Sequence, residues 1–99
     1  MPFILDRTDE AQQQLEKLER DAGLARQLKA VRKALGKLQL DPNYRGLNSH
    51  AMQGQLCPHG GTLNVSYAQN RTAGAYRIFW CYPPNARGTI LVIAITPHP

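Results

Sequence analysis

Residues 89–96, Thr-Ile-Leu-Val-Ile-Ala-Ile-Thr, form a nearly continuous apolar run in a chain of 99 residues. A strand covered on both faces has this composition, so we predict a central strand here. The preceding segment, 75–82 (AYRIFWCY), is rich in aromatic and β-branched residues and ends at the turn formed by residues 83–88. The two segments therefore predict a sheet built around neighbouring antiparallel strands.

Two successive segments before these strands carry apolar residues at helical spacing. The first set is Ala11, Leu15, Leu18 and Ala22, and the second is Leu24, Leu28, Val31, Leu35 and Leu38. We predict that Asp9 caps the first helix and that Gly23 ends it. The pattern favours a hairpin of two helices, and a single long helix kinked near Gly23 is the alternative.

The remaining segments complete one small domain. Residues 2–5 are long enough for a brief strand, and residues 63–67 alternate as a half-buried strand does. Residues 42–61 contain two prolines and four glycines, so we predict an irregular connection. The predicted fold class is α+β: one domain over 1–99 in which an N-terminal helical hairpin packs on a small, mainly antiparallel sheet, in the order β-α-α-β-β-β.

Charge is distributed unevenly along the chain. The net charge is +5, but residues 1–22 hold six of the seven acids, and the residues after Ala22 hold nine basic side chains and one acid, Asp41. The later part therefore carries about +8 and favours a polyanion or an acidic protein partner. A solvated surface that keeps a small protein soluble explains the charge equally well.

Neither a membrane span nor a signal-peptide pattern is recognisable in the sequence, so we expect a cytoplasmic protein. In that compartment Cys57 and Cys81 are expected to be reduced thiols, unless the fold brings them together. The spacing of these cysteines and of His50 and His59 does not favour zinc, and we expect no metal and no cofactor.

Arg77 lies in the middle of an apolar strand, where a basic side chain is costly to bury. If the turn at 70–74 is centred on Thr72, Arg77 lies opposite Tyr67. If the next turn is centred between residues 85 and 86, Arg77 lies opposite Ala94. Its guanidinium would either receive a phosphate, for which its planar fork is suited, or pair with an acid from the N-terminal segment.

His98 follows the last predicted strand. It would share the face of Arg77, about four residues or ~13 Å further along, beside Arg71 in the 70–74 turn. It is either a proton donor or acceptor, or a frayed residue in solvent. On the second helix, basic residues lie opposite the leucine stripe, and a solvated face is favoured over an RNA-binding one. The candidate phosphate-binding residues are Arg71, Lys29, Arg32, Lys33 and Arg45.

Three segments resemble the RelE/ParE superfamily of bacterial toxins: 46–50 (GLNSH), 75–80 (AYRIFW) and 93–99 (IAITPHP). The resemblance extends over essentially the whole chain. It implies a toxin of a toxin–antitoxin module, whose RelE-like branch enters the ribosomal A site and cuts the bound mRNA without a metal. The implied partners are a cognate antitoxin, the ribosome and mRNA, with no membrane.

The resemblance also implies roles for single residues. Arg77 matches the arginine that contacts the scissile phosphate, His98 resembles the general acid or base of YoeB-like members, and Arg71 would supply a second positive charge. RelE has a lysine pair on the second strand, and YoeB-like members have a catalytic Glu and a Tyr after the His; this chain has none of these. Tyr67 would serve as a substitute hydroxyl or stacking surface. A ParE-like inhibitor of DNA gyrase without nuclease activity and an inactive interaction protein therefore stay as alternatives.

Overall fold

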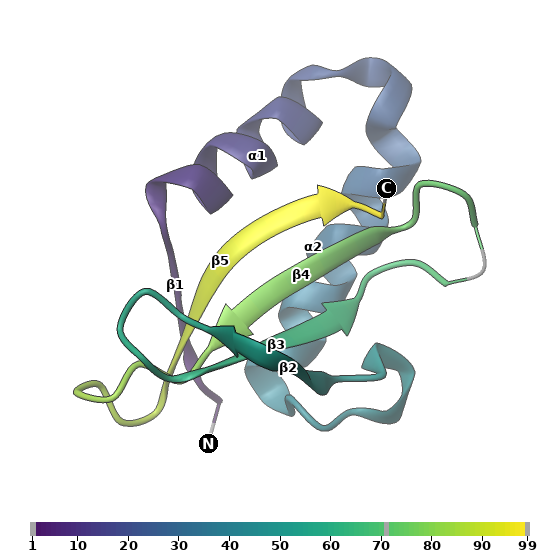
Figure 1. The fold of residues 1–99 in the computed structure, drawn as a ribbon. Helices are drawn as coiled ribbons and strands as arrows, with labels where there is room; N and C mark the ends of the chain where they lie inside the picture. Colours follow the sequence, from purple (N-terminus) through teal and green to yellow (C-terminus); the bar gives the residue numbers. More distant parts are fainter. Residues whose placement is uncertain (1, 71, 99) are drawn as a thin grey trace.

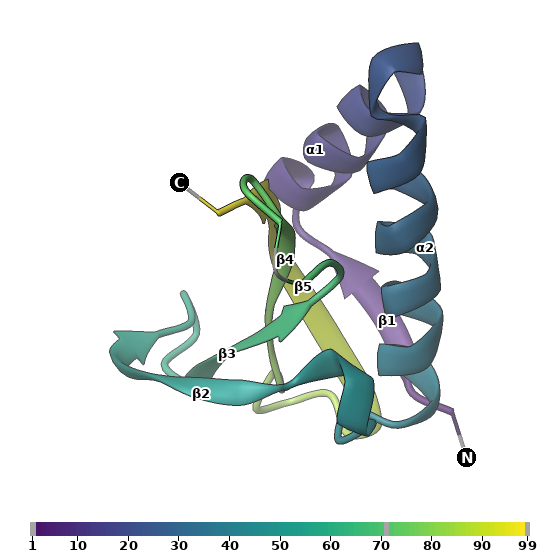
Figure 2. The same cartoon turned by 90° about the vertical axis from the view of Figure 1, so that its right-hand side faces the viewer.

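The computed structural model describes residues 2–70 and 72–98 as two helices packed on one face of a five-stranded sheet (Figures 1 and 2). The helices are α1 (Asp9–Arg20) and α2 (Ala25–Leu40), and short 3₁₀ turns follow each of them, η1 (Ala22–Leu24) and η2 (Arg45–Leu47). The strands are β1 (Ile4–Arg7), β2 (His50–Leu56), β3 (Thr62–Tyr67), β4 (Tyr76–Cys81) and β5 (Thr89–Pro97). The predicted α+β class is confirmed.

The sheet has the order β1-β5-β4-β3-β2, with β1 parallel to β5 and the other neighbours antiparallel. The run at 89–96 is indeed an interior strand, with neighbours on both sides. Within the described residues, no helix is long and apolar enough to cross a membrane.

Side-chain caps mark the start of α1 and the turn between the two helices. Thr8 caps α1, because its hydroxyl accepts a hydrogen bond from the Ala11 amide at 3.1 Å. Asp21 is extended and accepts from the Gly23 amide at 2.9 Å, which starts the turn before α2. The prediction of a hairpin is confirmed, whereas Asp9 as the cap and Gly23 as the end of the helix are wrong.

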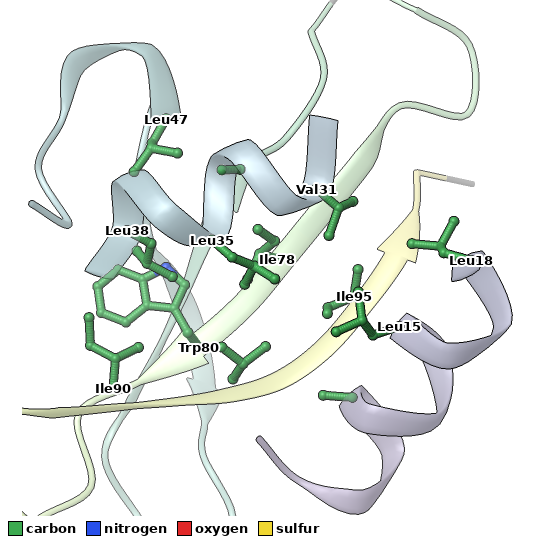
Figure 3. Close-up of a cluster of buried hydrophobic side chains, with 13 residues drawn as sticks. Leu15, Leu18, Val31, Leu35, Leu38, Leu47, Ile78, Trp80, Ile90 and Ile95 are labelled. Carbon is green, nitrogen blue, oxygen red and sulfur yellow. The ribbon is translucent and has the colours of Figure 1, made fainter. Parts of the chain in front are cut away.

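The core lies between the helices and the sheet (Figure 3). Its fully buried members include Leu18, Val31, Leu38, Ile78, Ile90, Val92 and Ile95. Trp80 lies beneath α2 and donates its indole N–H to the hydroxyl of Ser66 at 2.8 Å. That hydroxyl is also 2.6 Å from Ser49 Oγ, so a buried polar pair on β3 and β4 is linked to the segment before β2.

The strand register confirms one predicted pairing and corrects the other. Tyr67 lies opposite Arg77, as predicted. Arg77 lies opposite Thr96 rather than Ala94, and the register shifts beside Phe79. One residue of this difference arises because the turn is centred on residue 86 rather than between 85 and 86, and the other because the irregularity adds a residue to β5. His98 is therefore two residues beyond the partner of Arg77, or ~7 Å along the strand, not four.

Two further predictions are wrong. Residues 50–56 of the predicted irregular connection form β2, which pairs with β3 at the edge of the sheet. Cys57 and Cys81 are joined by a disulfide, with their Cα atoms 6.5 Å apart, so they are not the two reduced thiols that we expected. The fold brings them together because Cys57 follows the edge strand β2 and Cys81 ends β4.

Candidate functional site

The face of the sheet opposite the helices carries the residues predicted to be catalytic. Ile78 and Trp80 point into the core and Tyr76 packs against it, so Arg77, between residues 76 and 78, points to the other face of the sheet. Figure 2 shows the end of β5 on the side of the sheet away from α2. There, Tyr67, Arg77 and His98 line one cavity of about 390 Å³, together with residues 69, 70 and 72–75. The structure thus brings together the three predicted catalytic residues.

Tyr67 and Arg77 form the floor of this cavity, which we call the sheet cavity. The guanidinium carbon of Arg77 lies 5.2 Å from the centre of the Tyr67 ring, within the range of a cation–π contact. The ion pair found among the described residues is formed by Arg32 and Glu19. The predicted alternative in which Arg77 pairs with an acid from the N-terminal segment is therefore not observed. Stacking on an aromatic ring holds the guanidinium plane without neutralising its charge.

His98 lines the sheet cavity and directly follows β5, the strand that pairs with β4 beside Arg77. Its amide donates to the carbonyl of Ala75 at 2.8 Å, so the chain continues to pair with the β4 side beyond the end of β5. Residue 98 is therefore fixed to the sheet by its backbone rather than frayed. Figure 1 shows the end of β5 beside the loop that joins β3 and β4.

His50 is a histidine that the sequence analysis did not include in the site. Its ring meets the Tyr67 ring edge-on, with 5.9 Å between centroids and 74° between planes. Its Nδ1 is 2.9 Å from the carbonyl oxygen of Asn48. A carbonyl can only accept a hydrogen bond, so Nδ1 carries the proton of the neutral ring and Nε2 is left as an acceptor.

The local backbone explains where His50 lies. Asn48 adopts a left-handed conformation with φ of 49°, a region that Asn tolerates better than most residues, and this ends η2 before β2 begins. His50 pairs with Val65, so it shares a face with Tyr67, two residues further along β3. Recognition of 50–56 as a strand would have placed His50 in the site.

The predicted phosphate-binding residues are scattered. Arg71 lies outside the described residues. Arg32 contacts Glu19 on α1 at 3.0 Å, and Lys29 and Arg45 are exposed and line neither the sheet cavity nor the cavity beside it. Lys33 lines that second cavity, between α2 and the end of β3. The structure therefore does not gather the described members of this set around the sheet cavity.

Two solved structures have this fold. A YoeB/ParE toxin from Agrobacterium tumefaciens superposes with a TM-score of 0.71 and 14% identity, covering 97% of this chain and 99% of that one. A YoeB dimer from Staphylococcus aureus gives a TM-score of 0.65 and 9% identity over the whole of both chains. No protein-family model and no curated protein sequence matches. The chain therefore has the YoeB/ParE toxin fold, the fold that the resemblance implied.

Proposed function

We propose that this chain is the toxin of a toxin–antitoxin module and that it cuts mRNA in the ribosomal A site. The observation that carries the proposal is the convergence of Arg77, Tyr67 and His98 on one cavity at the face of the sheet opposite the helices. The YoeB/ParE toxin fold supports it, because YoeB and ParE toxins share the architecture on which these residues lie. The positive charge after Ala22 favours an RNA target over an acidic small molecule.

The proposed reaction is an internal phosphoryl transfer. The ribose 2′-oxygen attacks the adjacent phosphorus, the bond to the 5′-oxygen of the next nucleotide breaks, and a 2′,3′-cyclic phosphate and a 5′-hydroxyl result. Negative charge accumulates on the non-bridging oxygens in the transition state, and Arg77 stabilises it. The face of Tyr67 stacks on a nucleobase, which holds the ribose and phosphate beside Arg77.

Two imidazoles complete the proton transfers. His50 takes the 2′-hydroxyl proton at Nε2, because its hydrogen bond to Asn48 leaves that atom as the acceptor. His98 donates a proton to the departing 5′-oxygen. Loss of either imidazole is expected to lower the cleavage rate by about 10²–10⁴-fold, the usual range for general acid–base catalysis. The cognate antitoxin would inhibit the toxin by covering the sheet cavity.

The test uses purified protein with translating ribosomes and a defined mRNA. The parent is expected to give cuts in the A-site codon, and Arg77→Ala and His98→Ala to abolish them. Arg87→Ala is the matched control, because Arg87 is an exposed arginine in the β4–β5 loop, away from the sheet cavity. Equal cutting by Arg77→Ala and the parent would contradict the assigned site.

The alternative functions give different outcomes. The strand on which RelE has its lysine pair reads LNVSY over residues 63–67 here, and the lack of that pair and of the catalytic Glu favours a ParE-like inhibitor of DNA gyrase. Trapped gyrase–DNA cleavage complexes with intact mRNA would establish that function instead. Intact mRNA, no gyrase complexes and no growth arrest on expression would indicate an interaction protein.

A further inference from the structure

A second cavity lies next to the sheet cavity, between α2, η2 and the end of β3, and we call it the helix cavity. Its volume is about 310 Å³. The residues that line it are Ala30, Lys33, Ala34, Lys37, Gly46, Leu47, Tyr67, Ala68 and Asn70. Four of these are alanine or glycine, and their short side chains leave the space between the helix and the strand.

The polar groups around the helix cavity are hydrogen-bond donors and cations. Lys33 and Lys37 are one helical turn apart on α2, so their side chains leave the helix on the same side. The Lys37 ammonium lies 4.4 Å from the centre of the Tyr44 ring, which holds it beside η2. Asn48 donates to Asn70 Oδ1 at 3.4 Å, which leaves the NH₂ group of Asn70 as a donor. None of the described residues that line this cavity is acidic.

The helix cavity and the sheet cavity are neighbours that share two lining residues. Tyr67 and Asn70 line both. A ligand that lies across Tyr67 therefore has Arg77 and His98 on one side and Lys33 and Lys37 on the other. The ligand that carries negative charge at regular intervals, with flat groups between the charges, is a single-stranded nucleic acid.

We propose that the helix cavity binds a backbone phosphate of the same RNA strand whose neighbouring phosphate is cut in the sheet cavity. This subsite rests on the proposed function for its ligand, and Lys33, Lys37 and Asn70 are its contacts. Lysine suits the role, because it binds phosphate as a compact point charge. The basic residues of α2 thus have different roles. Arg32 pairs with Glu19 and Lys29 lies outside the cavity, whereas the two lysines that line the cavity bind the RNA.

The test measures RNA binding without cleavage. The probe is a fluorescein-labelled single-stranded RNA with 2′-O-methyl riboses, which lacks the attacking hydroxyl, and its anisotropy is followed over a series of KCl concentrations. The variant is Lys33→Ala/Lys37→Ala. Its matched control, Lys17→Ala/Lys29→Ala, removes the same charge from two lysines that line neither the sheet cavity nor the helix cavity.

The outcomes are distinguished by the slope of the logarithm of the RNA association constant K against the logarithm of the KCl concentration. For a single strand, each phosphate contact contributes about −0.7 to this slope. The slope of the Lys33/Lys37 variant is expected to be less negative than that of the parent by about 0.7 or more. The slope of the control variant is expected to equal that of the parent. Equal slopes for the two double variants would show diffuse charge only and overturn the subsite. The subsite would also be overturned if the Lys33→Ala/Lys37→Ala variant bound RNA like the parent but no longer bound an oligoglutamate peptide, because the cavity would then bind an acidic peptide.

The result is independent of cleavage. If the parent fails to cut mRNA on ribosomes while the Lys33/Lys37 variant still loses slope, the proposed nuclease fails and the RNA subsite stands. If the parent cuts mRNA and the slopes of the two double variants are equal, the nuclease stands and the subsite fails.

Discussion

Replacement of Ser66 by alanine tests the buried hydrogen bonds that join the core to the segment carrying His50. Ser66 is fully buried on β3, and its hydroxyl accepts from the Trp80 indole at 2.8 Å and contacts Ser49 Oγ at 2.6 Å. Trp80 itself is 3% exposed, so no water can replace the lost partner without rearrangement. Ser49 immediately precedes His50, so the same hydroxyl also anchors the start of β2.

The expected cost can be built from these contacts. A buried donor left without its partner costs about 1–3 kcal/mol, and the contact with Ser49 adds about 1 kcal/mol as an ordinary hydrogen bond. We therefore expect Ser66→Ala to lower the free energy of unfolding by about 2–4 kcal/mol. Ser49→Ala is expected to cost only about 1 kcal/mol, because the bond between Trp80 and Ser66 remains.

The assay is urea unfolding followed by far-UV circular dichroism, which does not depend on the tryptophan. A double-mutant cycle with Trp80→Phe removes the indole N–H, so Ser66→Ala should cost about 1–3 kcal/mol less in that background than in the parent. An equal cost in both backgrounds would show that the indole hydrogen bond does not stabilise the fold. The reasoning from the buried network would then be wrong.

Three further predictions concern other parts of the fold. Cys57→Ser should lower the free energy of unfolding by about 3 kcal/mol, because the disulfide closes a loop between residues 24 apart, and a reductant should destabilise the parent but not the variant. Thr8→Ala should cost about 1–2 kcal/mol in urea unfolding, since Thr8 caps α1 and also donates to the Ile93 carbonyl at 2.9 Å, whereas the exposed Thr72→Ala should cost less. Burial, and then the charge of Asp41, raise the pKa of Tyr82 above its ordinary value of 10.0. The folded state therefore keeps this proton more tightly, so stability should fall as the pH rises above 10 through the raised pKa, and Tyr82→Phe should flatten that decline.

The sequence was sufficient wherever a periodic pattern determined burial. The leucine stripes of α1 and α2 predicted two helices, and the apolar run of β5 predicted an interior strand, because burial of those faces is the main driving force of the fold. The pairing of Tyr67 with Arg77 was predicted because a short turn joins their strands.

The sequence was insufficient where tertiary contacts decide the structure. Strand β2 reads His-Ala-Met-Gln-Gly-Gln-Leu and has almost no buried side chain, so its pairing with β3, rather than its own pattern, makes it a strand. The register shift beside Phe79 moved His98 nearer to Arg77 than loop counting allowed. The disulfide likewise depends on the fold, which brings the ends of β2 and β4 together although β3 lies between these strands in the sheet.

The candidate site was predicted in part for the same reasons. Tyr67, Arg77 and His98 were predicted to share a face, and they do so in the structure. His50 was missed because its place depends on β2. The division of the basic residues on α2 could not be predicted, because it follows from the position of α1, whose Glu19 pairs with Arg32.

The chemistry of the cut ends tests the central claim most directly. RNA cut by the parent on translating ribosomes is isolated, and its new termini are identified by their reactivity toward polynucleotide kinase and phosphatase. The account predicts a 2′,3′-cyclic phosphate and a 5′-hydroxyl, formed by the parent and lost in His98→Ala. A 3′-hydroxyl with a 5′-phosphate, or unchanged termini and rates in His98→Ala, would contradict the assignment of Arg77, His50 and His98 to this reaction.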